Sequence, residues 1–196
     1  MPDVSPGASL LPERIAGPDG LLLRRWQTAD AEALGRAVGE SVEHLRPWMD
    51  WAAEEPLPLR RRRARIEAWG LDWAEGRDVV LGVFLGEEII GGCGLHRRIA
   101  PDGLEIGYWI HPAHLRRGWA TCVAGLLTDA ALGLPEITHV EIHHAKANQA
   151  SAGVPRKLGF SWLGEGPGEL GASADVVIKW RWRMDRASWE ARPSAE

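Results

Sequence analysis

The stretch from Glu105 to Thr121, EIGYWIHPAHLRRGWAT, decides how this chain is interpreted. It joins a strand pattern to a turn that contains Pro112, and then to two arginines and a glycine that open an apolar helix pattern. The first N–H groups of a helix have no acceptor within the helix, so a helix start flanked by arginine binds phosphate well. The stretch therefore predicts a site for a phosphate-bearing cofactor.

The composition narrows the class of protein. A chain of 196 residues suits one domain with a sizeable core, and 45% hydrophobic with 26% charged residues is ordinary for a globular protein. The net charge of −4 argues against bulk attraction to nucleic acid. The two cysteines, Cys93 and Cys122, do not make the disulfide framework of a secreted mini-protein, so reduced thiols in the cytoplasm are the simplest interpretation.

The ends of the chain carry no targeting signal that we recognise. No apolar run approaches the length of a membrane span, and the N-terminal segment lacks the basic start and apolar core of a secretory signal. We therefore expect a cytoplasmic protein with no membrane and no nucleic-acid partner. Residues 1–20 are predicted to form an extension rich in Pro and Gly, residues 21–185 the domain, and residues 186–196 a tail.

Hydrophobic periodicity and turn residues predict a mixed order of strands and helices. The expected strands cover residues 21–26, 79–85, 88–95, 103–110, 139–145, 160–163 and 174–183, with a glycine-rich loop at 164–171. The expected helices cover residues 28–38, 42–46, 59–75, 117–132 and 148–158, with Thr28 and Ser41 as N-caps of the first two. This order predicts a mixed α/β fold around one sheet, with three consecutive antiparallel strands at its centre.

The helix expected at 59–75 begins with four arginines, Arg60–Arg63. Positive charge in the first turn opposes the helix dipole, so we interpret this run as a solvated basic face. Contact with an acidic partner or with cofactor phosphates is the alternative. Trp69 and Trp73 follow at helical spacing and are expected in the core.

Four passages, taken in order and spacing, resemble one known family over about residues 21–185. They are Leu23-Arg-Arg-Trp26 with Asp30, Glu105–Pro112, Arg116–Thr121, and Asn148-Gln-Ala-Ser151 followed by Lys157-Leu-Gly-Phe160. The family is the Gcn5-related N-acetyltransferases, in particular the branch of the ribosomal-protein N-terminal acetyltransferases. The resemblance implies a single domain of α+β type, with a central, mostly antiparallel, splayed sheet flanked by helices.

The resemblance also implies that acetyl-CoA is the cosubstrate. The turn that grips its pyrophosphate falls on Arg116, Arg117, Gly118, Trp119, Ala120 and Thr121, with Asn148 as both helix cap and cofactor contact. The splayed strand would pair with the pantetheine arm through the backbone around Ile110 and His111, where an N–H would polarise the thioester carbonyl. One residue departs from the family pattern, which has Gln or Arg where this chain has Leu115.

The implied reaction needs a proton acceptor for the amine and a proton donor for the thiolate. Glu105 is the candidate acceptor, and the alternative is a strand glutamate neutralised by a nearby arginine; Glu165 and Glu169 are weaker candidates. Many relatives protonate the thiolate with a tyrosine, but the one tyrosine here, Tyr108, lies on the strand itself. Ser151 resembles the serine of this branch, and the alternative is an ordinary first-turn residue of the helix that Asn148 caps.

The resemblance implies that the wall of the acceptor pocket is formed by the segment around the helix-breaking Pro47, with His44, Trp48 and Trp51 as the candidate residues. The tryptophans could hold an aromatic or cationic amine by stacking or cation–π contact. His143 and His144 are adjacent on a strand and should face opposite sides, and no Cys/His spacing matches a zinc site, so no metal is expected.

Several alternatives stay open at this point. The acceptor could be a small-molecule amine or a protein N-terminus, the acyl group could differ from acetyl, and a homodimer is possible. A protein of the same fold could also bind an acyl-CoA as a sensor without turnover. Nucleic-acid binding through residues 60–65 is a weak third interpretation because the net charge is negative.

Overall fold

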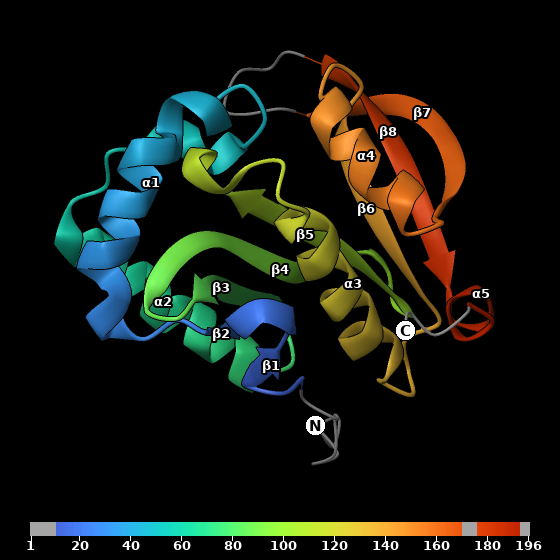
Figure 1. Ribbon diagram of the computed structural model, residues 1–196, viewed down its shortest axis with the longest axis horizontal. Helices are drawn as coiled ribbons and strands as arrows, with labels where there is room; N and C mark the ends of the chain where they lie inside the picture. Colours follow the sequence, from blue (N-terminus) through green and yellow to red (C-terminus); the bar gives the residue numbers. More distant parts are fainter. Residues whose placement is uncertain (1–10, 170–175, 193–196) are drawn as a thin grey trace, which may run out of the picture.

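Eight strands form one sheet in the order β1-β2-β3-β4-β5-β6-β8-β7 (Figure 1). The computed structural model describes residues 11–169 and 176–192, and all statements below concern these residues. The strands are β1 (Arg14–Ala16), β2 (Leu21–Arg25), β3 (Val79–Leu85), β4 (Glu88–Ala100), β5 (Gly103–Ile110), β6 (His139–Ala145), β7 (Ser161–Glu169) and β8 (Val176–Asp185). All neighbours pair antiparallel except β5 and β6, which are parallel. The predicted mostly antiparallel sheet is therefore confirmed.

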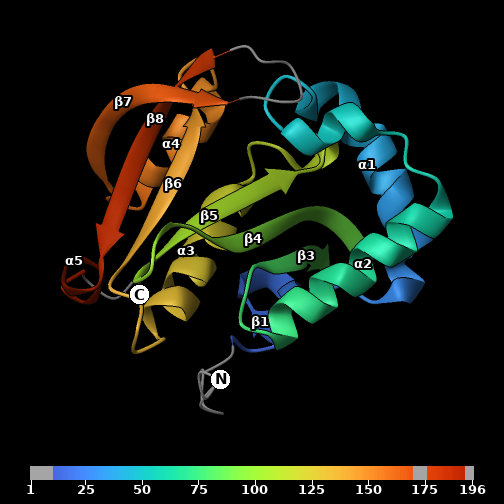
Figure 2. The same cartoon turned by 180° about the vertical axis from the view of Figure 1, so that it is seen from behind.

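Helices cover both faces of the sheet (Figures 1 and 2). One face carries α1 (Ala31–Leu45) and α2 (Leu59–Ala74), and the other carries α3 (Trp119–Leu132) and α4 (Gln149–Lys157). Short elements complete the order: η1 (Pro18–Gly20), η2 (Thr28–Asp30), η3 (Asp50–Glu54), η4 (Pro112–His114) and α5 (Arg186–Glu190). Each face has its own apolar core, because a sheet with alternating side chains buries both sides when helices cover both.

The sheet splits between its two parallel strands. β5 and β6 pair only from Gly103 with His139 to Glu105 with Glu141. Beyond Glu105, β5 continues along β4 as far as Ile110, and β6 continues along β8 as far as Ala145. The two halves of the sheet diverge from that point in both views (Figures 1 and 2). The gap between them carries the cavity described below.

The first helix differs from the prediction. Residues 31–45 form one continuous helix, whereas two helices were expected at 28–38 and 42–46. Ser41 does not cap a second helix: its side chain is buried and its hydroxyl donates to the Ala37 carbonyl at 2.7 Å, one turn back in the same helix. Thr28 begins the 3₁₀ turn η2, and Asp30 accepts the Gln27 backbone N–H at 2.8 Å there.

The glycine-rich segment also differs from the prediction. Most of the loop expected at 164–171 belongs to β7, which pairs with β8 along its length. Pairing with β8 satisfies the backbone hydrogen-bonding groups of this segment. Because glycine has no side chain, long side chains of β8 can pack over it. A Cβ on Gly168 would stand 2.5 Å from the Lys179 side chain. Residues 170 and 171 of the expected loop, and residues 174 and 175 of the expected last strand, lie outside the described residues.

Two further differences concern charge and the chain ends. Arg62 is not part of a solvated face, because it is buried and its guanidinium donates to Glu55 at 2.6 and 3.2 Å. Arg60, Arg61 and Arg63 are exposed as expected.

The expected extension contributes β1, which pairs with β2, and the expected tail contributes α5. The domain boundaries themselves stay a prediction, since residues 1–10 and 193–196 lie outside the described part.

Candidate active site

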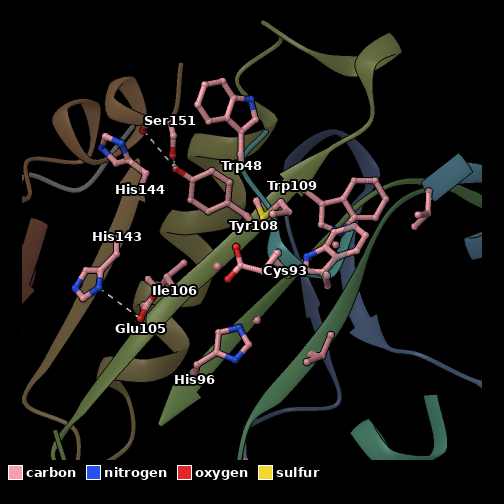
Figure 3. Close-up of a pocket in the computed structure, with 18 of the residues that line it drawn as sticks. Trp48, Cys93, His96, Glu105, Ile106, Tyr108, Trp109, His143, His144 and Ser151 are labelled. Carbon is pink, nitrogen blue, oxygen red and sulfur yellow. Dashed lines mark hydrogen bonds and ion pairs between the residues drawn. The ribbon is translucent and has the colours of Figure 1, made fainter. Parts of the chain in front are cut away.

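A cavity of about 460 Å³ occupies the place where β5 and β6 part (Figure 3). Its lining comes from both faces of the sheet. The face of α4 supplies Tyr108, Asn148 and Ser151; the face of α1 and α2 supplies Trp48, Trp51, Trp69, Trp109 and Glu105; β6 supplies His143 and His144. The gap in the sheet therefore connects the two faces. A ligand entering from the α3–α4 side can meet a ligand entering from the α1–α2 side.

Tyr108 and Ser151 meet at one end of the cavity. The Tyr108 hydroxyl lies 3.0 Å from Ser151 Oγ and 3.4 Å from the Ser151 carbonyl oxygen (Figure 3). Even-numbered side chains of β5 face α3 and α4, so a tyrosine on the strand reaches the residue that follows the Asn148 cap. Tyr108 is thus a tyrosine of the cavity that contacts Ser151. The parity of the strand pattern was the signal that could have identified it.

Because of Pro155, the Ser151 carbonyl lacks the N–H donor that it would normally have in a helix. In an α-helix the carbonyl of residue 151 accepts the N–H of residue 155, and proline has no N–H. The Tyr108 hydroxyl lies near this oxygen instead. α4 continues through Pro155 to Lys157, in agreement with the helix expected at 148–158. Asn148 caps the helix by accepting the Ser151 N–H at 3.1 Å, and Ser151 is both a first-turn residue and a residue of the cavity.

Burial keeps Tyr108 protonated. Desolvation raises the pKa of Tyr108 to about 12, with the hydrogen bond to Ser151 acting in the opposite direction. A phenol with that pKa holds its proton at neutral pH. The Tyr108–Ser151 pair therefore offers O–H donors to a base that forms in the cavity, such as a thiolate.

The turn before α3 has the backbone of an anion site. Arg116 and Gly118 have φ angles of +59° and +86°, the left-handed region that glycine adopts without strain. The first intrahelical bond runs from Cys122 N–H to the Gly118 carbonyl, so the N–H groups of residues 119–121 precede the hydrogen-bonded ladder. The side chains of Arg116 and Arg117 are exposed at this helix start. Trp119, Ala120 and Thr121 are half-buried in its first turn.

The end of β5 corrects one detail of the prediction. The His111 N–H donates to the Ile90 carbonyl at 2.8 Å, so it is already used and does not face the gap. Ile110 lies opposite Gly91 in the β4 ladder, and backbone groups of successive strand residues point to opposite sides. The N–H and C=O groups of Tyr108 and Ile110 therefore point toward the gap. The His111 side chain contacts Glu40 on α1, with Nε2 and Oε2 3.0 Å apart.

Glu105 lies at the point where the splay begins, and both of its oxygens accept from Arg98, at 2.7 and 2.8 Å. His143 Nδ1 lies 3.5 Å from Glu105 Oε2 (Figure 3). Burial alone would raise the pKa of Glu105, but the hydrogen bonds and charge of Arg98, aided by His143 and His96, bring that pKa below its ordinary value. Glu105 therefore holds its negative charge firmly, as the alternative interpretation expected.

The next strand repeats this arrangement. Glu141 on β6 lies beside Glu105, accepts from Arg183 at 2.6 and 2.9 Å, and lies 2.6 Å from His143 Nε2. Burial would raise the pKa of Glu141, and the hydrogen bonds from His143 and Arg183 bring it below its ordinary value. His144 faces the other side of β6, where its Nε2 accepts the Trp182 indole N–H at 3.0 Å. The expected opposite orientation of the two histidines is confirmed.

Tryptophans line a large part of the cavity. We call Trp48, Trp51, Trp69 and Trp109 the aromatic wall. The rings of Trp51 and Trp109 lie 6.1 Å apart and are tilted by 56°. Asp50 and Glu54 of η3 line the same cavity. Trp109 was not predicted, although it lies on the same strand face as Glu105.

His44 does not join this site. Its side chain is exposed near the end of α1, and it is absent from the cavity lining. Glu165 lies on β7, outside the cavity lining, and pairs with Lys146 at 2.8 Å. The side chain of Glu169 lies outside the described residues. Within residues 11–169 and 176–192, no group of three or more His, Cys, Asp or Glu side chains is arranged to hold a metal ion, and no helix is both long and apolar enough to cross a membrane.

Comparisons with known proteins identify the class of transferases to which the chain is similar. Residues 20–161 match the model of the family described as acetyltransferase (GNAT) domain. YdaF of Bacillus subtilis (strain 168), named as a candidate ribosomal N-acetyltransferase, is 26% identical over 141 residues, which are 71% of this chain and 77% of YdaF.

Two solved structures share the fold. RimL, a ribosomal L7/L12 α-N-protein acetyltransferase in complex with coenzyme A, superposes with a TM-score of 0.81 at 20% identity, covering 90% of this chain and 99% of RimL. MccE, the microcin C7 self-immunity acetyltransferase in complex with acetyl-CoA and AMP, has a TM-score of 0.81 at 18% identity, covering 91% of this chain and 99% of MccE.

The splayed sheet, the cavity where β5 and β6 part and the helix start after a left-handed turn are consistent with an acetyltransferase. The chain belongs to the GNAT acetyltransferase family. It is an acetyl-CoA-dependent N-acyltransferase, as the sequence resemblance implied.

Proposed function

We propose that the protein transfers the acetyl group of acetyl-CoA to the α-amine of a protein N-terminus, by direct attack within a ternary complex. The observation that carries the proposal is the cavity itself, which joins the Tyr108–Ser151 pair on one face of the sheet to the aromatic wall on the other. Two substrates can meet there without a covalent enzyme intermediate. The buried thiol that lines the cavity, Cys93, is a poor nucleophile because desolvation raises its pKa well above the usual range.

Acetyl-CoA would lie with its pyrophosphate on the backbone N–H groups of residues 117–121, with Arg116 and Arg117 adding charge. Its pantetheine arm would continue along the free edge of β5, where Tyr108 and Ile110 present backbone groups to the gap. Asn148 would contact the arm from α4. This route brings the thioester between β5 and β6, beside Ser151.

The Tyr108–Ser151 pair would protonate the departing thiolate. Tyr108 is protonated at neutral pH, and its hydrogen bond to Ser151 Oγ allows either hydroxyl to present the proton. The gap-facing N–H groups of β5 would stabilise the oxyanion that forms when the amine attacks. Together these groups serve only the transition state and the leaving group, which is where catalysis requires them.

The acceptor would enter over the aromatic wall. An α-amine has a pKa of about 7.7–8.0, so part of it is neutral at physiological pH. The relatives named for ribosomal-protein acetylation support a protein N-terminus as the acceptor. A small aromatic or cationic amine is the second candidate, and the specific observation in its favour is the number of tryptophans in the wall.

An acceptor screen tests the proposal. Release of free CoA thiol is measured with acetyl-CoA against a library of amines and a set of N-terminal peptides of ribosomal proteins, and the acetylated atom is located by mass spectrometry. Acetylation of peptide α-amines at a rate above that of all small amines supports the proposal. Tight CoA binding with no release above background for any acceptor would instead support an acyl-CoA sensor.

A further inference from the structure

The proton acceptor for the incoming amine is the group that the proposed function leaves open. Glu105 is poorly suited to it, since both oxygens already accept from Arg98. Protonating Glu105 would break a bidentate ion pair in a site where the side chain is only 11% exposed. A base that must gain and lose a proton in each turnover needs an unshared lone pair that faces the cavity.

His143 has that lone pair. Glu141 is anchored by Arg183 and stays ionised, so in the neutral imidazole of His143 the single proton lies on Nε2, which is 2.6 Å from Glu141 Oε2. The Nδ1 atom is then an acceptor, and it faces Glu105 Oε2 at 3.5 Å. Two acceptors at this distance have no hydrogen between them. An N–H donor of a substrate ammonium can bond to both, which makes the space beside them an ammonium site.

The position of His143 fits the chemistry. Glu105 and Glu141 form the last paired rung between β5 and β6, and His143 lies two residues further, on the wall of the gap. Its side chain points from β6 toward Glu105 (Figure 3). The groups around it are Glu105 on β5, Arg98 and His96 on β4, Glu141 on its own strand, and Arg181 and Arg183 on β8.

We propose that His143 Nδ1 accepts a proton from the bound ammonium of the acceptor, with Glu105 holding the ammonium and Glu141 orienting the imidazole. This inference rests on the proposed function. In the step, one ammonium N–H bond breaks and one Nδ1–H bond forms, which leaves a neutral amine and an imidazolium between two carboxylates. The amine nitrogen attacks the thioester carbon, and the C–S bond then breaks.

Three further proton transfers complete the reaction. The thiolate takes a proton from the Tyr108–Ser151 pair. The attacking nitrogen, which still carries two protons, gives one of them to that pair and keeps the other as the amide N–H. His143 releases its proton to solvent through the mouth of the cavity. The net reaction is ammonium plus acetyl-CoA to amide, CoA thiol and one proton. Glu141 touches no reacting atom and is a positioning residue, in the manner of the carboxylate of a catalytic triad.

The test compares variants of full-length protein by thiol release over pH 5.5–9.5. His143→Gln should lower kcat about 100-fold, within the usual range for a lost general base, while the acetyl-CoA KM changes less than threefold. His143→Ala should regain at least tenfold of its rate in the presence of added imidazole. Glu141→Gln should lower kcat and displace the acidic limb of the profile. His44→Asn, an exposed histidine outside the cavity, is the matched control and should leave kcat and the profile unchanged.

A second readout does not depend on turnover. In ¹⁵N-histidine NMR spectra at pH 8, His143 should show a protonated Nε2 and an unprotonated Nδ1. Retention of kcat within threefold in His143→Gln, or a proton on Nδ1 at pH 8, would overturn the inference. Complete absence of thiol release in the wild-type protein would refute the proposed function, whereas an active wild type with unaffected His143 variants would refute this inference alone.

Discussion

The Tyr108 hydroxyl on β5 lies 3.0 Å from the Ser151 hydroxyl on α4, and 43 residues of chain separate the two. Two features make this contact. Asn148 holds Ser151 in the first turn of α4, and Pro155 leaves the Ser151 carbonyl without its helical donor. The contact places two hydroxyl groups side by side in the lining of the cavity.

Tyr108→Phe should lower kcat by about 10²-fold with little change in the acetyl-CoA KM, because the phenol is needed when the thiolate leaves. Ser151→Ala should lower kcat in the same direction. The double variant should be little worse than the poorer single variant, since residues that act as a unit are not additive. Steady-state kinetics with one acceptor checks this, and fully additive losses would show that the two hydroxyls act separately.

Trp51→Ala should raise the acceptor KM about tenfold and leave the acetyl-CoA KM within twofold, because the aromatic wall faces the acceptor side of the gap. Trp162→Ala removes an exposed indole on β7, outside the cavity, and serves as the control. Equal changes in both KM values, or loss of folding by circular dichroism, would remove the aromatic wall from acceptor binding.

Gly118→Ala should weaken acetyl-CoA binding and leave the acceptor KM nearly unchanged. The φ angle of +86° costs an alanine about 1 kcal/mol, and relaxation of that strain moves the N–H groups of the turn. Gly39→Ala, an exposed glycine in α1 with open space around its Cα, should stabilise the protein by up to about 1 kcal/mol. Titration calorimetry with CoA gives the affinity, and unchanged affinity in Gly118→Ala would contradict the assigned turn.

Glu55→Gln should destabilise the protein by about 3–5 kcal/mol, because it leaves the buried Arg62 without its counter-charge. The neighbouring exposed pair, Arg65 with Glu54 at 2.7 Å, supplies the comparison: Glu54→Gln should cost less than about 1 kcal/mol. Urea unfolding curves measure both. A double variant, Glu55→Leu with Arg62→Met, should recover most of the loss, and equal costs for the two single variants would contradict the assigned burial.

Acid should weaken the fold through Glu105 and Glu141. Both pKa values lie below the ordinary 4.5 in the folded protein, so the unfolded chain binds protons first as the pH falls. Their contribution is fully present above the unfolded pKa and is lost as the pH falls through the lower folded values. Unfolding free energies measured from pH 7 to pH 3 should fall less steeply in Glu105→Gln than in wild type. Parallel curves would show that Glu105 titrates alike in both states.

The sequence predicted what depends on local pattern. The alternation in β5, the helix start at residue 118 and the Asn148 cap could be placed because turn, cap and period each have a residue signature. The continuity of α1 through Ser41 could not be predicted, because a serine donates back into its own helix as readily as it caps a new one. The strand expected at 160–163 is the start of β7, but its continuation over residues 164–169 was missed, because glycine is poor in isolated strands and only pairing with β8 compensates.

Side-chain partners were harder to predict than elements. Nothing local distinguishes Arg62 from Arg61 or Arg63, and burial follows only from the approach of Glu55. His143 was considered only as a metal ligand, since its contacts with Glu105 and Glu141 depend on which strands lie side by side. His44 shows the opposite error. Its place in the sequence suggested that it lines the cavity, but its side chain is exposed on α1.

The short ladder between β5 and β6 has a mechanical consequence. Only three residue pairs join the half of the sheet that contains β1 to β5 with the half that contains β6, β8 and β7. A pantetheine arm that bonds to the edge of β5 would fill the gap with polar contacts that the polypeptide itself does not make. The cosubstrate would then act as a removable ninth strand, and the rigidity of the C-terminal third would follow the supply of acetyl-CoA.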